Sequence, residues 1–205
     1  SMEQHRAAIR SSMFIKAKHL PSGAFDKLKA RLVAGGDQQD KSLYPNLSAS
    51  TAATSSVFIL AAIAAQEHRI VAVVDITGAY LNADMSPITV HMRVDPFMTT
   101  LLTKLKPSYA PCVRRDGGCI VKLEKALYGC VESAALWADH IKATLIADQF
   151  VQNFVEPCCY NRQFGKVQLT VIIQVDDLLV SCVDQSAIDG FLSMLRRKYK
   201  DLGVS

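Results

Sequence analysis

Two apolar segments that carry acidic residues constrain the fold of this chain most strongly. Residues 69–75 read R-I-V-A-V-V-D, so a near-continuous apolar run ends in Asp75. Such a run is typical of a central strand that is covered on both faces. A second apolar run, over residues 167–183, is interrupted by Asp176 and Asp177. An acid beside strongly apolar sequence is costly to bury without a partner, so these positions also indicate a site.

The three acids predict a metal site. If the segments that flank Asp176 and Asp177 pair as a hairpin, both acids lie at its tip, and Asp75 on a neighbouring strand lies within a few ångströms of them. A divalent cation is the usual reason to tolerate such a cluster, and oxygen ligands without a His or Cys cluster favour Mg²⁺ or Mn²⁺ over zinc. Two such ions about 4 Å apart can activate a hydroxyl and stabilise a leaving pyrophosphate. The alternative is two turn aspartates and a strand-end cap.

Composition and hydropathy argue against an intrinsically disordered chain and against a membrane-spanning one. The chain has 205 residues, enough for one full-sized domain or at most two small ones. Its 50% hydrophobic and 20% charged residues exclude disorder over most of its length. The longest uninterrupted apolar run, residues 57–65, is far shorter than the ~20 residues needed to cross a bilayer, so we expect no membrane span. The net charge of +4 permits an anionic partner without requiring one.

The six cysteines are scattered and include no C-x-x-C pair, so neither a disulfide framework nor a zinc site is expected. We interpret them as reduced, mostly buried thiols of an intracellular protein. The N-terminus carries no apolar signal segment. Ser1 and Met2 resemble a cloning remnant, so the chain is expected to be part of a longer protein.

Sequence patterns also predict a hairpin and several other elements. Pro21-Ser22-Gly23 is a turn signal between two stretches that alternate basic and apolar residues, which predicts a hairpin with one positive face; a solvated edge hairpin explains the same charges. The Ala-rich residues 51–67 predict a buried helix capped by Ser48 or Ser50. Further predicted elements are strands near 119–123, 158–162 and 167–175, and helices over 133–150 and 185–199. This α+β order is compatible with a ferredoxin-like split βαβ sheet with helices on one face, an architecture of polymerase palms and of many unrelated domains.

Five segments in order resemble copia-type retrotransposon reverse transcriptases, and together they cover roughly residues 14 to 203. Residues 29–34 match K-A-R-L-V-A, 75–82 resemble D-V-K-T-A-F-L-N, 125–129 match K-A-L-Y-G with Trp137 where S-P-R-A-W ends, 174–179 match Y-V-D-D-L-L, and 200–203 resemble the end of M-K-D-L-G. Each match is weak alone, but the ordered set is specific.

The resemblance implies the fingers and palm of a right-hand polymerase, with the thumb absent. The chain would form one reverse transcriptase-like domain over residues 1–205, with fingers roughly at 1–68 and 87–130 and palm roughly at 69–86 and 131–205. Its activity would be that of an RNA-directed DNA polymerase, which adds dNTPs to a primer 3′-hydroxyl on an RNA or DNA template by two-metal nucleotidyl transfer. Mg²⁺ would be the cofactor, with Mn²⁺ as an alternative.

The resemblance also assigns site residues. Asp75, Asp176 and Asp177 align with the three metal-binding carboxylates of the family, and the Ile76 carbonyl would complete the metal shell. Tyr80 would lie beneath the incoming sugar and exclude a 2′-hydroxyl, although a core tyrosine is the alternative. The remaining assignments are the Gly78 and Ala79 amides toward the nucleotide, Lys29 and Arg31 toward the triphosphate with Lys27 as a competitor, and Gln174 and Lys125 toward primer and template.

The sequence departs from the family at two places. Gln174 replaces the first tyrosine of Y-V-D-D, and residues 130–137 read C-V-E-S-A-A-L-W where the family has L-K-Q-S-P-R-A-W. Glu132 is therefore expected to place a negative charge near the nucleotide surface and to weaken phosphate binding. These replacements are consistent with a diverged, decaying or domesticated copy as well as with an active enzyme. The alternative function is therefore a non-catalytic nucleic-acid-binding or scaffold domain. A metal nuclease is a weaker third hypothesis, because no histidine or general base lies near the acids.

In the family, the primer-gripping segment, thumb and RNase H domain follow the D-L-G motif. The resemblance therefore implies a catalytic-core fragment with weak, salt-sensitive binding to nucleic acid. The implied partners are template and primer, dNTPs, and the thumb, RNase H and integrase regions of a parent polyprotein, with no membrane partner. The implied location is the cytoplasm, within virus-like particles.

Overall fold

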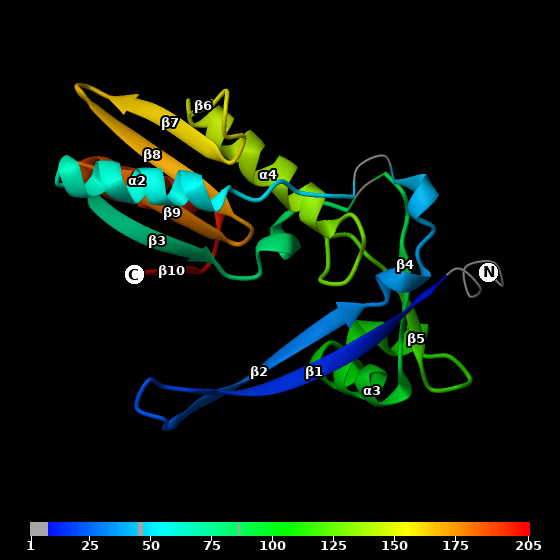
Figure 1. The fold of residues 1–205 in the computed structure, drawn as a ribbon. Helices are drawn as coiled ribbons and strands as arrows, with labels where there is room; N and C mark the ends of the chain where they lie inside the picture. Colours follow the sequence, from blue (N-terminus) through cyan, green and yellow to red (C-terminus); the bar gives the residue numbers. More distant parts are fainter. Residues whose placement is uncertain (1–7, 45–46, 86) are drawn as a thin grey trace. The chain divides into compact units, whose positions relative to one another are not determined.

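The computed structural model describes residues 8–44, 47–85 and 87–205, and the chain divides into two compact units (Figure 1). The first unit comprises residues up to 47 together with 83–133, and the second comprises 48–82 together with 134–205. Ser1 and Met2, expected to be a cloning remnant, lie outside the described residues. The described residues form helices and two β-sheets, which agrees with the predicted α+β class.

The first unit is built on a four-stranded sheet with the order β2-β1-β4-β5. The predicted hairpin is confirmed, since β1 and β2 pair antiparallel around a turn in which Gly23 has φ +83°. The register places Lys16 opposite Lys29 and Lys18 opposite Lys27, so the hairpin carries lysines in directly opposed pairs. The strands of this sheet are β1 (Ile9–His19), β2 (Phe25–Ala34), β4 (His91–Val94) and β5 (Cys119–Lys122).

Residues 86–118 had no clear sequence pattern, yet their described part contains an α-helix, α3 (Pro96–Leu105). Asp95 caps this helix by accepting a hydrogen bond from the Met98 N–H, and proline occupies the first turn, where its missing N–H costs nothing. The short 3-10 turns of this unit are η1 (Gly36–Gln38), η2 (Lys41–Leu43) and η4 (Pro107–Cys112).

The second unit is built on a six-stranded antiparallel sheet with the order β10-β3-β9-β8-β7-β6. The predicted strands and helices after residue 69 are confirmed within a few residues at each end. The elements are β3 (Ile70–Ile76), η3 (Ala79–Asn82), α4 (Ser133–Ala147), β6 (Val151–Gln152), β7 (Cys159–Phe164), β8 (Val167–Gln174), β9 (Asp177–Cys182), α5 (Gln185–Lys198) and β10 (Leu202–Val204).

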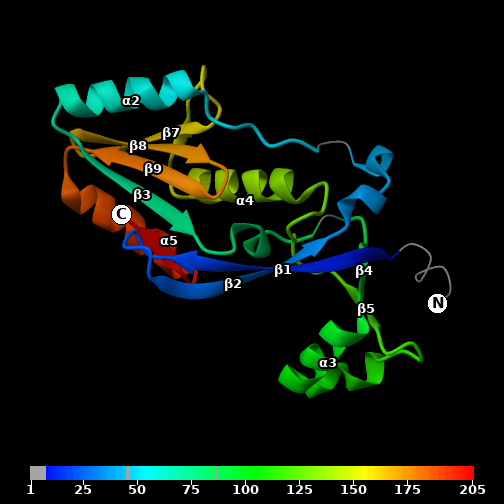
Figure 2. The ribbon, with the colours of Figure 1, turned by 60° about the horizontal axis from the view of Figure 1, so that its bottom comes forward.

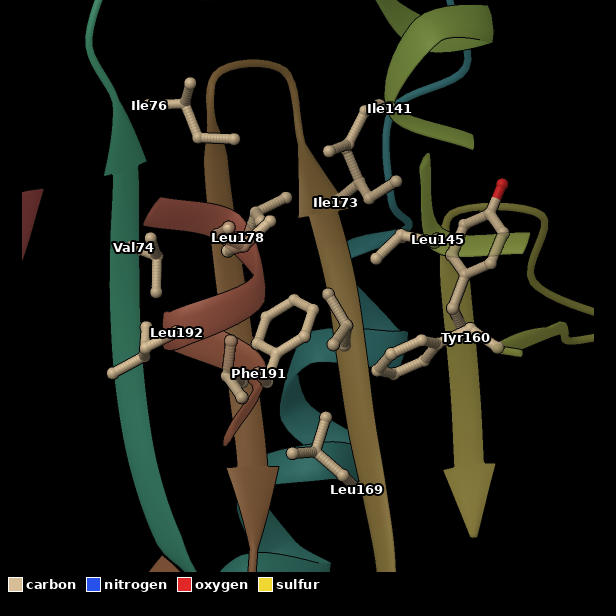
Figure 3. Close-up of a cluster of buried hydrophobic side chains, with 14 of the residues drawn as sticks. Val74, Ile76, Ile141, Leu145, Tyr160, Leu169, Ile173, Leu178, Phe191 and Leu192 are labelled. Carbon is tan, nitrogen blue, oxygen red and sulfur yellow. The ribbon is translucent and has the colours of Figure 1, made fainter. Parts of the chain in front are cut away.

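Helices cover both faces of the second sheet. In Figure 2, α4 and α5 lie on one face and α2 (Thr54–Gln66) lies on the other. The main core is formed between the sheet and the α4/α5 pair, where Leu178 and Val74 meet Ile141, Leu145 and Phe191 (Figure 3). This core fixes which side chains of β3 and β9 point inward, and therefore which point to the opposite face.

The prediction of a buried, serine-capped helix at 51–67 was wrong in two respects. Of the α2 residues, only Leu60 and Ala64 are buried, whereas Phe58 is 69% exposed. The helix is apolar all round, so its sequence could not show which side the sheet covers. Its start is held by Glu156, whose carboxylate accepts hydrogen bonds from the Ala53 N–H and the Ser56 hydroxyl, and these bonds lower the pKa of Glu156.

The expectation that residues 69–75 form a strand covered on both faces was also wrong. Val74 and Ile76 are buried on the α4/α5 side, but Val71 and Val73 on the other side are exposed. The buried Leu60 of α2 packs instead with Ile172 of β8 and Leu179 of β9.

The structure also bears on membrane-spanning helices and on the state of the cysteines. Among the described residues, no helix combines the length and apolar character needed to span a membrane. All six cysteines are described and are free thiols; Cys112 is exposed, Cys159 is half-buried and the other four are buried. The prediction of mostly buried thiols is therefore confirmed.

Candidate metal and nucleotide site

Strands β3 and β9 bring two of the predicted acids side by side. Asp75 is the register partner of Asp177, the first residue of β9. Because their neighbours Val74 and Leu178 point into the core, the two carboxylates lie on the opposite face of the sheet, where both residues are exposed. Directly opposed side chains on neighbouring strands have Cβ atoms about 5 Å apart, close enough for two carboxylates to interact strongly.

Asp176 joins them through the turn between β8 and β9. Gln174 pairs with Asp177, so only Val175 and Asp176 form the loop of this hairpin. The Ile76 N–H donates to the Asp176 carbonyl at 3.4 Å, which ties the turn to the end of β3. The prediction that the adjacent acids lie at a hairpin tip is confirmed, and all three acids lie at the same end of the sheet.

The electrostatics of this cluster are unfavourable without a counter-charge. Burial raises the pKa of Asp177, and the negative charges of Asp75 and Asp176 raise it further. The described part of the chain contains no set of three or more His, Cys, Asp or Glu side chains already arranged to hold a metal ion. The donors nevertheless fit a hard divalent cation, because they are carboxylate oxygens whose mutual repulsion such an ion relieves.

Gly203 leaves space beside Asp75, and no sequence pattern apart from the D-L-G motif singled it out. On the side of Asp75 away from Asp177, β10 places Gly203 as the register partner. A Cβ atom added to Gly203 would lie 3.5 Å from the Cβ of Asp75, in ordinary contact, whereas a longer side chain would cover the carboxylate. Glycine here keeps one flank of Asp75 open.

The residues after β3 form a tight turn next to these acids. Gly78 has φ +65°, a conformation that favours glycine, and the Asn82 amide donates to the carbonyls of Gly78 and Ala79 at 3.3 Å. Tyr80 is half-buried and packs against the main core of the second unit. Burial raises the pKa of Tyr80, and the negative charge of Asp176 raises it further.

Three of the predicted site residues belong to the first unit. Lys29 lies in the exposed hairpin opposite Lys16. The Arg31 guanidinium lies 5.5 Å from the centre of the Tyr128 ring, a cation–π contact. Lys125 forms an ion pair with Asp84, with 2.5 Å between its Nζ atom and Asp84 Oδ1.

The expected surface charge of Glu132 is not found. This residue is 3% exposed, and its Oε2 atom accepts a hydrogen bond of 3.0 Å from the Gln39 side-chain amide. The Gln39 amide oxygen in turn accepts from the Val131 N–H, so Glu132 is held within the first unit. Burial, and next the charge of Glu132, raise the pKa of Cys130 to about 11. Glu132 therefore acts on its buried neighbours rather than on a solvent-facing surface.

Comparison with known proteins shows the family of this chain. The family model described as reverse transcriptase (RNA-dependent DNA polymerase) matches residues 3–205. A retrovirus-related Pol polyprotein from transposon RE1 of Arabidopsis thaliana is 25% identical over 89% of the chain, and the transposon Ty1-ER2 Gag-Pol polyprotein of Saccharomyces cerevisiae is 26% identical over 83%. The chain spans only 12% and 9% of these two relatives. The chain belongs to the reverse transcriptase (RNA-dependent DNA polymerase) family, and its relatives confirm the resemblance to the copia-type retrotransposon enzymes.

Proposed function

We propose that this chain is the catalytic core of an RNA-directed DNA polymerase from a copia-type retrotransposon. It would transfer deoxynucleotides from dNTPs to a primer 3′-hydroxyl on an RNA or DNA template. The observation that carries the proposal is the cross-strand pair of Asp75 and Asp177 with Asp176 in the adjoining turn, in a chain of this family. The fold alone would not suffice, because one fold hosts many functions.

We propose that the second unit is the palm. Its elements β3, α4, β8, β9, α5 and β10 follow the order βαββαβ, and their strands lie in the order β10-β3-β9-β8, which supports a ferredoxin-like arrangement. The resemblance of the sequence to the family implied fingers at 1–68 and 87–130 and a palm at 69–86 and 131–205. Because α2 packs on β8 and β9, we assign residues 54–66 to the palm instead.

We propose that Asp75, Asp176 and Asp177 hold Mg²⁺ or Mn²⁺ together with the Ile76 carbonyl. The bound ions would supply the positive charge that lowers the pKa of the primer hydroxyl and offsets the charge developing on the phosphates. The carboxylates fix where that charge sits, and the short β8–β9 turn limits their movement relative to Asp75.

The nucleotide would lie next to these acids. We propose that Tyr80 supports the sugar and excludes a 2′-hydroxyl, and that the Gly78 and Ala79 amides donate to the nucleotide. Tyr80 shares the electrostatic field of Asp176, which supports its place near the reacting groups. Lys29 and Arg31 would neutralise the triphosphate, with Lys27 as a competitor, since all three are exposed and alternate residues of a strand lie on the same face.

Primer and template are proposed to contact Gln174, the last residue of β8, and Lys125 of the first unit. The relatives are Pol and Gag-Pol polyproteins, so thumb, RNase H and integrase regions are proposed as partners within a longer chain. A cytoplasmic location in virus-like particles is proposed on the same basis.

A primer-extension assay tests the proposal. The chain is incubated with a DNA primer on an RNA template, dNTPs and Mg²⁺ or Mn²⁺, beside the variant Asp176→Asn/Asp177→Asn. We expect metal-dependent extension that the double variant loses and that the control Asp189→Asn keeps, since Asp189 is exposed on α5 and bonded to Gln185. If neither this chain nor a longer chain that continues through the thumb extends a primer, the function is that of a nucleic-acid-binding or scaffold domain.

A further inference from the structure

The turn that presents Asp176 has a strained backbone. Val175 has φ +58°, a region that β-branched residues rarely occupy, whereas Asp176 is not among the described residues with a positive φ. A two-residue hairpin loop with a positive φ at its first position only has the signature of a type II′ turn, in which glycine is the favoured first residue. Valine at this position therefore stores strain that the surrounding structure must offset.

One side chain holds this turn directly. The Nε1–H of Trp137, on α4, donates a hydrogen bond of 2.8 Å to the Val175 carbonyl. The two residues are 38 positions apart in the sequence, so the contact depends on how α4 packs against the β8–β9 hairpin. The Val175 carbonyl therefore has a hydrogen-bond donor in a fixed position. This bond stabilises the observed turn relative to conformations in which the Val175 carbonyl points elsewhere.

The indole of Trp137 is itself immobilised. It is 2% exposed, and its ring stacks on His140 with centroids 5.7 Å apart and meets Tyr199 edge-on at 5.9 Å. The Tyr199 hydroxyl lies 3.1 Å from the Thr144 hydroxyl, so the aromatic cluster of Trp137, His140 and Tyr199 is anchored to α4 at a second point. A donor fixed in this way can hold the turn in one geometry.

We infer that Trp137 is a positioning residue for the Asp176–Asp177 turn: its indole N–H holds Val175 in a strained conformation and thereby fixes the carboxylates that face Asp75. This inference rests on the proposed function for its consequence, metal binding, but its structural part concerns the turn alone. Trp137 touches no reacting group in this account, so its effect on the site passes through Val175.

The first experiment measures the turn without metal or substrate. Amide hydrogen exchange is followed across residues 173–179 in the wild type, Trp137→Phe, Val175→Gly and the double variant. Phenylalanine keeps an aromatic ring but removes the donor, so we expect about tenfold faster exchange in Trp137→Phe, equivalent to about 1.4 kcal/mol. Glycine tolerates a positive φ, so Trp137→Phe should accelerate exchange by less than about threefold when residue 175 is glycine.

The second experiment measures the metal site in the same four proteins. We expect Trp137→Phe to weaken Mn²⁺ binding by about tenfold and Val175→Gly to restore most of that loss. Ser186→Ala is the control, because it removes a hydroxyl that donates to Asp184 at the start of α5, beyond the end of β9 that is opposite to the turn, and no contact of the aromatic cluster. It should lower the thermal stability while leaving Mn²⁺ affinity within about twofold of the wild type.

The outcomes separate this inference from the proposed function. Unchanged exchange in Trp137→Phe, or an equal effect of Trp137→Phe whether residue 175 is valine or glycine, overturns the inference. Faster exchange with unaltered Mn²⁺ affinity also overturns it, because the turn would then not position the acids. Failure of the wild type to bind Mn²⁺ contradicts the proposed metal site instead, while the exchange data still decide whether Trp137 holds the turn.

Discussion

Asp75→Asn should reduce primer extension by about a thousandfold while the chain remains folded. Loss of a metal-binding carboxylate removes several kcal/mol of transition-state stabilisation, which corresponds to a rate effect of this size. The side chain is exposed and its carboxylate adds to the repulsion that raises the pKa of Asp177. The substitution should therefore leave thermal stability unchanged or slightly raised, and rates are compared with melting temperatures of the same preparations.

Asp189→Asn is the matched control for this substitution, since it also removes one exposed carboxylate from the second unit but lies on α5. Its extension rate should stay within about twofold of the wild type. Retention of more than about a tenth of the wild-type rate in Asp75→Asn would show that this residue does not bind an essential metal ion.

Phe191→Ala should lower the free energy of unfolding by about 3–5 kcal/mol, because it leaves a cavity in the main core. Phe191 is 1% exposed and lies between the sheet and α5, with its ring centre 5.3 Å from that of Phe150 (Figure 3). The site acids are carried by strands of this same core, so the variant should also reduce extension at temperatures where it begins to unfold. Urea unfolding followed by circular dichroism gives the free energy.

Phe154→Ala is the corresponding control, because Phe154 is 99% exposed and its truncation removes almost no buried surface. We expect its free energy of unfolding to stay within about 0.5 kcal/mol of the wild type. If the two variants lost similar stability, the core would not be centred on the contact between the sheet and α5.

Local patterns in the sequence predicted the elements that depend on local chemistry. The turn at Pro21-Ser22-Gly23 was predicted from its turn residues, and α5 from the helical spacing of its apolar residues. The hairpin of β8 and β9 was predicted from an apolar run that two acids interrupt. All three elements are observed. The two apolar runs also predicted that Asp176 and Asp177 lie at a hairpin tip and that Asp75 ends a neighbouring strand, and the structure has all three acids at one end of the sheet. Residues 86–118 gave no prediction of elements: the α-helix α3 in their described part was missed, and the short strand and 3-10 turn beside it leave no period to detect.

The features that the sequence predicted wrongly or did not predict depend on packing between segments that are distant in the sequence. An all-apolar α2 predicts burial, but its sequence cannot show that only Leu60 and Ala64 face the sheet. Glu132 was expected at a surface, but it is buried and accepts a hydrogen bond from Gln39, a residue 93 positions away in the sequence. The bond from Trp137 to Val175 and the open flank that Gly203 leaves beside Asp75 are likewise tertiary, so motif matches alone gave them no role.

Mn²⁺ binding by the wild type and by three single variants, Asp75→Asn, Asp176→Asn and Asp177→Asn, tests the central claim most directly. Free Mn²⁺ is measured by electron paramagnetic resonance over a range of pH. We predict that each variant binds at least about tenfold more weakly. Wild-type affinity should fall as acidification protonates Asp177, beginning at a higher pH than for an ordinary aspartate because its pKa is raised. Equal affinity in the wild type and Asp75→Asn would contradict a shared metal site.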